Sequence, residues 1–219
     1  MSVEPISDHT DPEAPVRGTL HRAPAGNGDF LVLTHGASGN SNAELLVALA
    51  DGFARVGTSV LRCDLPYRQR KPAGPPSPAG AKHDQQGLKN AVTLMKKQFS
   101  GRAFLGGSSY GGRQASMLCA AQPQLVDGLL LLSYPLHPPG KPEQLRTQHF
   151  PDLHAPSLLV SGTRDTFATI EELKTAIELI RARTKLVEVE GAGHGLSDKK
   201  RQIIVVRTVT DSFIEFFGG

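Results

Sequence analysis

Cysteine and large aromatic side chains are scarce in this sequence: its 219 residues include two cysteines, no tryptophan and three tyrosines. Cys63 and Cys119 each lie within an apolar stretch, and neither belongs to a Cys-x-x-Cys pair or to a Cys/His ligand spacing. This pattern excludes a disulfide framework and a structural zinc site. Unpaired cysteines are typical of a reducing compartment, so we expect the protein to be cytoplasmic.

Long apolar runs and a strong charge imbalance are also missing. No run of about 18 apolar residues occurs, which argues against a membrane-spanning helix. Residues 1–15 are polar, acidic and proline-bearing, unlike a signal peptide. The net charge of +3 is spread along the chain without interleaved aromatic residues, so it favours neither a nucleic acid nor a membrane as partner. We expect a small-molecule substrate instead. No motif indicates a metal or an organic cofactor, or an oligomeric state.

Short β-type runs alternate with helix-length amphipathic segments along most of the chain. This alternation implies right-handed crossovers and a mostly parallel central sheet with helices on both faces, an α/β fold. We therefore predict a single α/β domain over residues 18–219, preceded by a flexible N-terminal arm over residues 1–17. The predicted strands cover residues 30–36, 58–64, 103–107, 126–134, 156–162 and 185–191, and the predicted helices cover residues 42–57, 83–99, 110–122, 169–183 and 198–217.

Two proline-rich segments, residues 66–80 and 134–156, are too long and too irregular to be simple connections. Each follows the C-terminal end of a predicted strand. Ligand sites in open α/β sheets lie at that edge. We therefore expect both segments to form part of the wall of a site.

The stretch GGSSYGGRQ, residues 106–114, places four glycines around Ser108 and Ser109 directly after an apolar strand. Within it, GSSYG matches G-x-S-x-G, the nucleophile elbow, in which a serine occupies a strained strand-to-helix turn and glycines leave room for the reversal. The register selects Ser109, and not Ser108, as the nucleophile. Taken alone, the pentapeptide also fits a glycine-rich turn that cradles a phosphate.

A serine nucleophile needs a histidine to take its proton and a carboxylate to orient that histidine. Asp165 and His194 each come just after a predicted strand. Taken singly, Asp165 is typical of a helix cap and His194 of a glycine-rich turn. Together with Ser109, however, they follow the chain order of α/β-hydrolases, and all three positions converge at one sheet edge. We predict a Ser109-Asp165-His194 triad, with Asp127 and Asp152 as the alternative carboxylates.

The tetrahedral intermediate of acyl transfer also needs two N–H donors for its oxyanion. One should come from Tyr110, the residue after the nucleophile. The other should come from the loop THGASGN that follows the first strongly buried strand, with Ala37 as the first candidate and Ser38 as the second. We expect His35 to be structural and to fix this loop.

Five segments, LTHGASGN, GGSSYGGR, SYPLHPPGKPEQLR, SGTRDTF and GAGHGL, resemble a small family of α/β-hydrolases. That family includes bacterial dienelactone-hydrolase-like proteins, a mammalian testis-expressed protein and the hydrolase-like domain of a chromatin-complex subunit. The resemblance runs from about residue 28 to residue 217, and YPLHPPG is its most specific element. It implies an α/β-hydrolase fold without a separate cap domain and a Ser109-Asp165-His194 triad. True dienelactone hydrolases have a cysteine in place of Ser109, which argues against dienelactone as the substrate.

Without a cap domain, the two proline-rich segments must form most of the pocket wall, which favours small substrates over long-chain lipids. The candidate substrate-binding residues are His137, Arg68, Arg70 and Arg113. Solvated loop charges and a structural histidine are the alternative interpretations. Arg113 falls in the first turn of a predicted helix, where a cation opposes the helix dipole, so it indicates an anionic partner or an ion pair within the fold.

Two classes of function follow from these residues. The first is a carboxylesterase-like serine hydrolase that acts on a small ester, thioester or related acyl compound through an acyl-enzyme on Ser109. The second is a catalytically silent binding or scaffold protein with a hydrolase fold. The complete triad favours catalysis, because a scaffold has no chemical need to keep three such residues in order.

Overall fold

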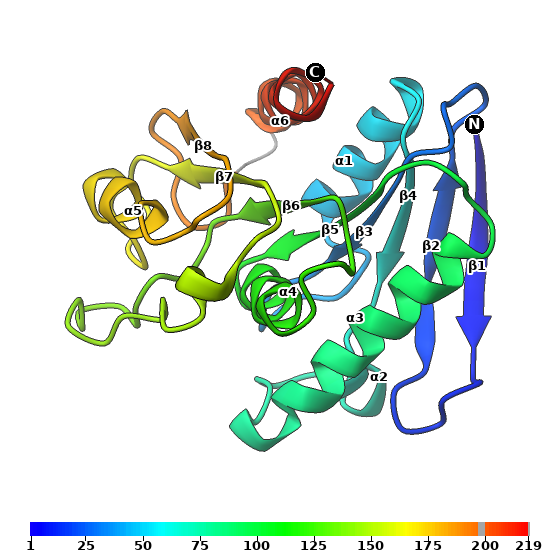
Figure 1. The fold of residues 1–219 in the computed structure, drawn as a ribbon, viewed down its shortest axis with the longest axis horizontal. Coiled ribbons are helices and arrows are strands. Elements are labelled where there is room, and N and C mark those ends of the chain that lie inside the picture. The colour runs from blue at the N-terminus through cyan, green and yellow to red at the C-terminus, as the bar shows by residue number, and fades with distance from the viewer. Residues whose placement is uncertain (197–199, 219) are drawn as a thin grey trace.

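A single eight-stranded sheet runs through the molecule in the computed structural model, which describes residues 1–196 and 200–218 (Figure 1). The strand order is β1-β2-β4-β3-β5-β6-β7-β8. The pairs β1–β2 and β2–β4 are antiparallel, and every pair from β4 to β8 is parallel. The strands are β1 (Ser2–Asp8), β2 (Val16–Arg22), β3 (Phe30–Thr34), β4 (Ser59–Cys63), β5 (Ala103–Ser108), β6 (Gly128–Leu132), β7 (Ser157–Gly162) and β8 (Thr184–Val189).

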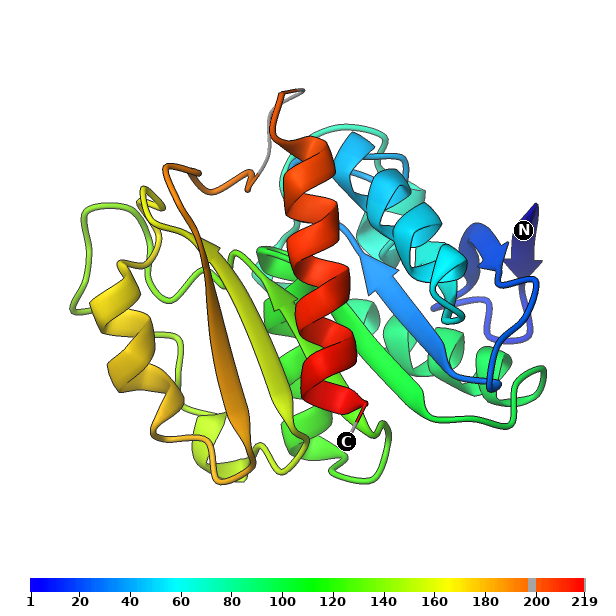
Figure 2. The ribbon, with the colours of Figure 1, turned by 90° about the horizontal axis from the view of Figure 1, so that it is seen from above.

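Helices cover both faces of this sheet, as the two ribbon views show (Figures 1 and 2). The α-helices are α1 (Glu44–Arg55), α2 (Pro66–Arg70), α3 (Ala81–Lys96), α4 (Tyr110–Ala121), α5 (Ile170–Ile177) and α6 (Gln202–Phe217). Helices α1 and α6 pack on one face, and α3, α4 and α5 pack on the other. Side chains alternate along each strand, so Leu31 and Leu33 of β3 face α1 and α6, whereas Phe30 and Val32 face the opposite core. Burial on both faces explains why the central strands are continuous apolar runs.

Each predicted strand and helix has a counterpart that differs at its ends, whereas β1, β2 and α2 were not predicted. The predicted helix over residues 169–183 ends at Ile177, and the predicted strand over residues 126–134 covers only Gly128–Leu132. Residues 198 and 199, at the start of the last predicted helix, lie outside the described residues, and α6 begins at Gln202. The fold is thus an α/β sheet of the predicted kind.

The N-terminal arm is the main correction to the predicted fold. Residues 1–17 were expected outside the domain, but β1 pairs along its whole length with β2 and extends the sheet at one edge. No side chain of β1 is fully buried, and backbone hydrogen bonds and the ion pair between Glu4 and Arg22 (2.9 Å) hold the hairpin. Ile6 is the residue of β1 that packs against the core, and because most of the other side chains of this segment are polar, its composition did not reveal the pairing.

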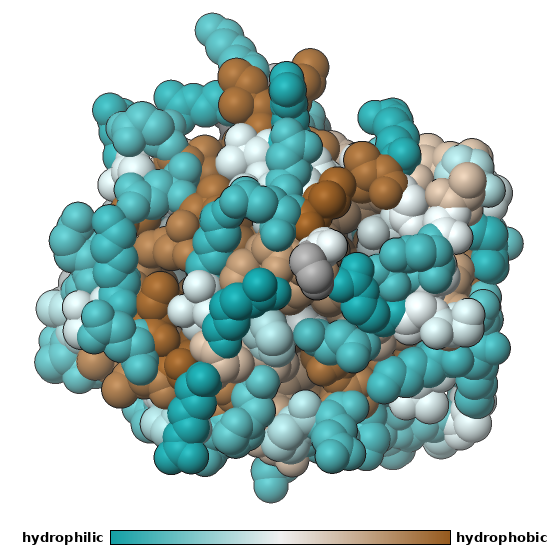
Figure 3. All heavy atoms as spheres, turned by 45° about the horizontal axis from the view of Figure 1, so that its top comes forward, coloured by the Kyte–Doolittle hydropathy of each residue, from teal (hydrophilic) through white to brown (hydrophobic). Residues whose placement is uncertain are grey.

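One face of the surface is dominated by hydrophilic residues, with hydrophobic residues in separate groups between them (Figure 3). The most exposed large apolar side chains are Ile203 and Ile204 in the first turn of α6, at 82% and 67% exposure. Among the described residues, none of the helices combines the length and the hydropathy that crossing a membrane requires.

Candidate active site

The carboxyl ends of the parallel strands meet at one edge of the sheet. Ser109 directly follows β5, Asp165 lies three residues beyond β7, and His194 lies five residues beyond β8. The parallel pairing of β5 through β8 is therefore what brings these three distant parts of the chain together.

The turn between β5 and α4 has the strained backbone of a nucleophile elbow. Ser109 has φ 51° and ψ −116°, and its N–H donates to the Leu132 carbonyl at 2.8 Å. A Cβ atom at Gly107 would lie 2.8 Å from the Gly111 carbonyl carbon, and one at Gly111 would lie 2.5 Å from the His35 carbonyl oxygen. Neither distance is compatible with a side chain, so both glycines are required by close backbone approach.

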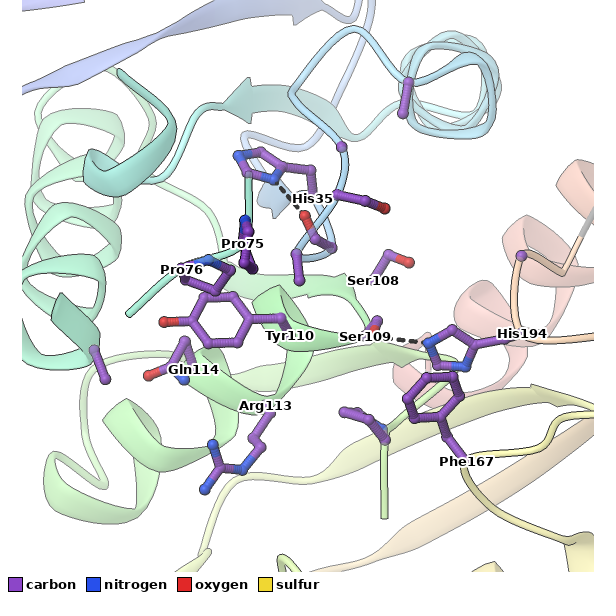
Figure 4. Close-up of a pocket in the computed structure, with 18 of the residues that line it drawn as sticks. His35, Pro75, Pro76, Ser108, Ser109, Tyr110, Arg113, Gln114, Phe167 and His194 are labelled. Atoms are coloured by element: carbon purple, nitrogen blue, oxygen red, sulfur yellow. Dashed lines mark hydrogen bonds between the residues drawn. The ribbon is translucent and has the colours of Figure 1, made fainter. Parts of the chain in front are cut away.

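Three side chains form a continuous hydrogen-bonded chain at this edge, and Figure 4 shows the part of it that joins Ser109 to His194. The Ser109 Oγ lies 2.8 Å from His194 Nε2, and His194 Nδ1 lies 2.9 Å and 2.8 Å from the two Asp165 carboxylate oxygens. Because Nδ1 faces only carboxylate oxygens, it carries the ring proton, and Nε2 accepts from the Ser109 hydroxyl. This is the arrangement in which histidine is ready to take the serine proton.

The acid and the histidine are both held in place by Phe167, which the sequence did not single out. Its N–H donates to Asp165 Oδ1 at 2.8 Å, and its ring stacks on the His194 imidazole with centroids 4.0 Å apart. The Asp165 carboxylate is fully buried, whereas 26% of the His194 side chain is exposed. The imidazole therefore reaches the cavity from a fixed position while its carboxylate stays shielded from water.

The sequence also allowed Asp165 to cap a helix, and Asp127 or Asp152 to be the carboxylate of the triad. Thr169, and not Asp165, caps α5, in a capping box with Glu172. Asp127 accepts a hydrogen bond from the Ala103 N–H at 2.7 Å, at the start of β5, and Asp152 lies in a short 3-10 helix. Neither of these carboxylates pairs with the histidine.

The loop after β3 packs against the nucleophile and has a fixed backbone. The Gly36 carbonyl accepts from His35 Nδ1 at 2.8 Å and from the Tyr67 hydroxyl at 3.2 Å, on the buried side of the loop. In a planar trans peptide the N–H points opposite to the carbonyl, so the Ala37 N–H points away from His35 Nδ1 and the Tyr67 hydroxyl. Gly36 packs so closely that a Cβ there would lie 3.4 Å from Ser109 Cβ.

His35 behaves as the sequence predicts. It is fully buried, its Nε2 accepts from the Leu65 N–H at 3.1 Å, and burial lowers its pKa. It thus stays neutral and ties the loop to the start of α2.

Arg68 is a candidate for substrate contact or for a solvated loop charge, and the structure shows neither. Its guanidinium is buried and donates to the Ala37, Gly39, Lys71 and Gly74 carbonyls at 2.8–3.1 Å. A guanidinium presents five N–H donors in a planar fork, so it can bind several loop carbonyls at once. Arg68 therefore stabilises the Ala37 loop through its carbonyls and does not line the cavity.

Tyr110 is the first residue of α4, so its N–H has no acceptor within the helix. Its hydroxyl donates to Asp84 Oδ2 at 2.7 Å, and Asp84 Oδ1 accepts the Tyr67 N–H at 3.0 Å. Burial raises the pKa of Asp84, and burial together with Asp84 raises the pKa of Tyr110, so the phenol remains a donor. Sequence reasoning missed Asp84, because a lone aspartate within a helix carries no signal for this contact.

A cavity of about 810 Å³ opens beside the hydrogen-bonded serine. The first proline-rich segment lines it with residues 75–78, and the second contributes only Pro135 and Arg146. The remaining wall comes from the Ala37 loop, the start of α1, the first turns of α4 with Arg113 and Gln114, and the loops that carry Phe167, His194 and Gly195. The proline-rich segments thus form part of the wall, but the second one contributes less than expected.

The candidates Arg70 and His137 do not line this cavity, and the alternative interpretations, a solvated charge and a structural histidine, describe them. Arg70 is exposed on the far side of α2, beside the turn between β1 and β2. His137 is buried, with Nδ1 2.8 Å from the Pro138 carbonyl and Nε2 3.2 Å from Glu172, and the hydrogen bond to Pro138 raises its pKa. Of the four predicted substrate-binding residues, only Arg113 lies at the cavity.

Comparison with known proteins identifies the family of the chain. A family model described as an alpha/beta hydrolase domain matches residues 27–215. The chain belongs to the alpha/beta hydrolase family. Within this family, its fold has helices on both faces of the sheet and no separate cap domain.

Solved structures of alpha/beta hydrolases have the same fold over their whole length. Dienelactone hydrolase from Anabaena variabilis is 18% identical, with a TM-score of 0.79 and 98% of each chain covered. An alpha-beta serine hydrolase homologue from Coxiella burnetii is 19% identical, with a TM-score of 0.77 and coverage of 97% of this chain and 98% of that one. A serine hydrolase without lid from Xanthomonas campestris is 15% identical, with a TM-score of 0.76 and coverage of 100% and 97%.

Proposed function

We propose that this protein is a serine hydrolase that cleaves a small ester, thioester or related acyl compound through an acyl-enzyme on Ser109. The observation that carries the proposal is the unbroken chain from the Ser109 hydroxyl through both nitrogens of His194 to Asp165. The adjoining cavity has the size of small-molecule sites.

In the acylation step, His194 Nε2 takes the proton of the Ser109 hydroxyl as the oxygen attacks the substrate carbonyl carbon. Asp165 holds the imidazole in the required tautomer and stabilises the imidazolium that forms. The N–H groups of Ala37 and Tyr110 donate to the oxyanion. His194 then gives its proton to the leaving group, and the carbonyl re-forms as the ester of Ser109.

In the deacylation step, His194 takes a proton from water, and the resulting oxygen nucleophile attacks the acyl carbon. The same two N–H groups stabilise the second oxyanion, and the proton returns to Ser109 as the acid product leaves. Asp165→Asn removes the acceptor that fixes the tautomer, and by analogy with other triads we expect it to lower kcat by roughly four orders of magnitude.

The test uses a fluorophosphonate probe, which reacts with an activated serine without any assumption about substrate. We expect a single adduct on Ser109 by mass spectrometry, and none in Ser109→Ala. Ser108→Ala is the matched control, because this serine is adjacent and lines the same cavity, and it should still be labelled. Folded wild-type protein that fails to react would contradict the hydrolase proposal and favour a binding or scaffold role.

We also propose that the protein works in the cytoplasm on a small-molecule substrate. Cys63 and Cys119 are buried and unpaired, as in proteins of reducing compartments. Burial raises the pKa of both thiols to about 12, so neither competes with Ser109 as a nucleophile.

A further inference from the structure

The first turn of α4 presents two hydrogen-bond donors that have no acceptor. Arg113 Nε and Gln114 Nε2 are buried atoms without a hydrogen-bond partner within the described residues. Gln114 is completely buried, and its Oε1 accepts from Gln85 Nε2 at 2.9 Å, which leaves its amide N–H groups unused. Both residues line the cavity beside Ser109, and Figure 4 shows them on the side of Ser109 opposite His194.

A second guanidinium, that of Arg146, lines the same cavity from the loop after β6. The backbone of Arg146 is fixed, because its N–H donates to the Leu136 carbonyl and its carbonyl accepts the Tyr134 hydroxyl, both at 2.8 Å. Among the described residues, its side chain has one hydrogen bond, a long contact of 3.4 Å with the Pro135 carbonyl. Burial and the charge of Arg113 both lower the pKa of Arg146.

Among the described residues, no acid pairs with these two cations. The described residues that line the cavity include neither aspartate nor glutamate, and the ion pairs of the described residues do not include Arg113 or Arg146. Arg113 also lies at the positive end of the α4 dipole, which adds to the electrostatic cost. Unpaired buried donors and two neighbouring cations are costly in the free protein, and a bound anion would offset both costs.

We propose that Arg113, Arg146 and Gln114 form a subsite for an anionic oxygen-bearing group, a carboxylate or a phosphate, on the substrate of Ser109. The statement that the anionic group belongs to a substrate rests on the proposed hydrolase function. The anion site itself does not. Arg113 follows Ser109 by four residues, about 6 Å of helix rise. The anionic group therefore belongs to a short substrate, a few bonds from the scissile carbonyl.

Matched substrate pairs test this subsite. The mono-4-nitrophenyl ester of glutarate and 4-nitrophenyl pentanoate differ only in whether the acyl chain ends in a carboxylate or a methyl group. The acetate esters of 4-hydroxybenzoate and 4-methylphenol place the same difference on the leaving group. We expect wild-type kcat/KM to favour the carboxylate member of at least one pair.

Arg113→Gln and Arg146→Gln should each lower kcat/KM for the carboxylate esters about ten- to hundredfold more than kcat/KM for the neutral esters, as loss of a charge-assisted hydrogen bond predicts. Arg70→Gln is the matched control, because Arg70 is exposed and outside the cavity, and it should change neither rate. Equal loss on charged and neutral esters, or a wild type without preference in both pairs, would overturn the subsite.

A binding experiment separates this proposal from the hydrolase proposal. Calorimetric titration of Ser109→Ala with glutarate and with inorganic phosphate needs no catalysis, and it distinguishes a carboxylate from a phosphate subsite. We expect one of the two anions to bind, and the added change Arg113→Gln to weaken that binding at least tenfold. Binding without fluorophosphonate labelling of the wild type would leave the anion subsite standing and refute the hydrolase. Labelling of the wild type, without anion binding and without a preference for carboxylate esters, would support the hydrolase and refute the anion subsite.

Discussion

Tyr110→Phe is the substitution that most directly tests how the elbow helix is held. The change removes one oxygen atom and keeps the ring and the backbone N–H of residue 110. The lost hydroxyl donates to the fully buried Asp84 carboxylate at 2.7 Å. That carboxylate then keeps only the Tyr67 N–H, at 3.0 Å, as a hydrogen-bond donor.

The size of the effect follows from the charge on Asp84. Hydrogen bonds to charged groups contribute about 1.5–3 kcal/mol to the free energy of unfolding. For a domain of 150–250 residues this corresponds to a fall in Tm of roughly 3–12 °C. Burial already raises the pKa of Asp84, and the Tyr110 hydrogen bond opposes that shift, so removal of the hydroxyl raises this pKa further.

The pH dependence has a definite sign. The native state of the variant binds a proton on Asp84 more tightly than the native wild type does. The destabilisation is therefore complete above the raised Asp84 pKa of the variant and shrinks as the pH falls through it. Chemical unfolding of both proteins from pH 8 down to about pH 4 measures this difference, with Asp84→Asn as the background in which the dependence should vanish. A destabilisation of equal size at every pH would refute the assignment of an ionised Asp84 as the partner of Tyr110.

Two further predictions concern the loops around Ser109. Gly111→Ala should lower the free energy of unfolding by about 1–3 kcal/mol, because the new Cβ would lie 2.5 Å from the His35 carbonyl oxygen. Gly195→Ala is the control, because a Cβ there has no atom within 4 Å and should leave stability unchanged. Thermal unfolding of both variants measures the difference. Arg68→Lys should slow fluorophosphonate labelling of Ser109 at least tenfold, because a lysine cannot replace the guanidinium that binds four loop carbonyls. Arg70→Lys, on the exposed side of the same helix, should label at the wild-type rate, and an equal effect of the two changes would argue against a brace at Arg68.

The grouping of Ser109, Asp165 and His194 was predictable because it depends on topology. Each of them follows a parallel strand, and parallel strands end at one edge, so chain order and strand position were enough to bring them together. The elbow glycines were predictable for a related reason, since the strand-to-helix reversal leaves no room for side chains. Local sequence carries this information directly.

Other parts depended on contacts that no local pattern records. Arg68 and Arg70 lie two residues apart in the same charged segment, yet one is buried under the Ala37 loop and the other is exposed. Composition cannot separate them, because the difference comes from which side of the short helix α2 faces the sheet. The pairing of Asp84 with Tyr110 likewise depends on how α3 packs against α4.

The segment around α2 links both N–H donors proposed for the oxyanion. The Tyr67 hydroxyl donates to the Gly36 and Ala37 carbonyls, which fixes the first donor loop, and the Tyr67 N–H donates to Asp84. Asp84 in turn fixes the ring of Tyr110, which meets the Tyr67 ring edge-on at a centroid distance of 5.8 Å. A shift of α2 would therefore disturb both donors at once, although Tyr67 itself does not line the cavity. The start of the first proline-rich segment thus holds the loop and the helix that carry the two N–H donors. Within this segment, residues 75–78 line the cavity.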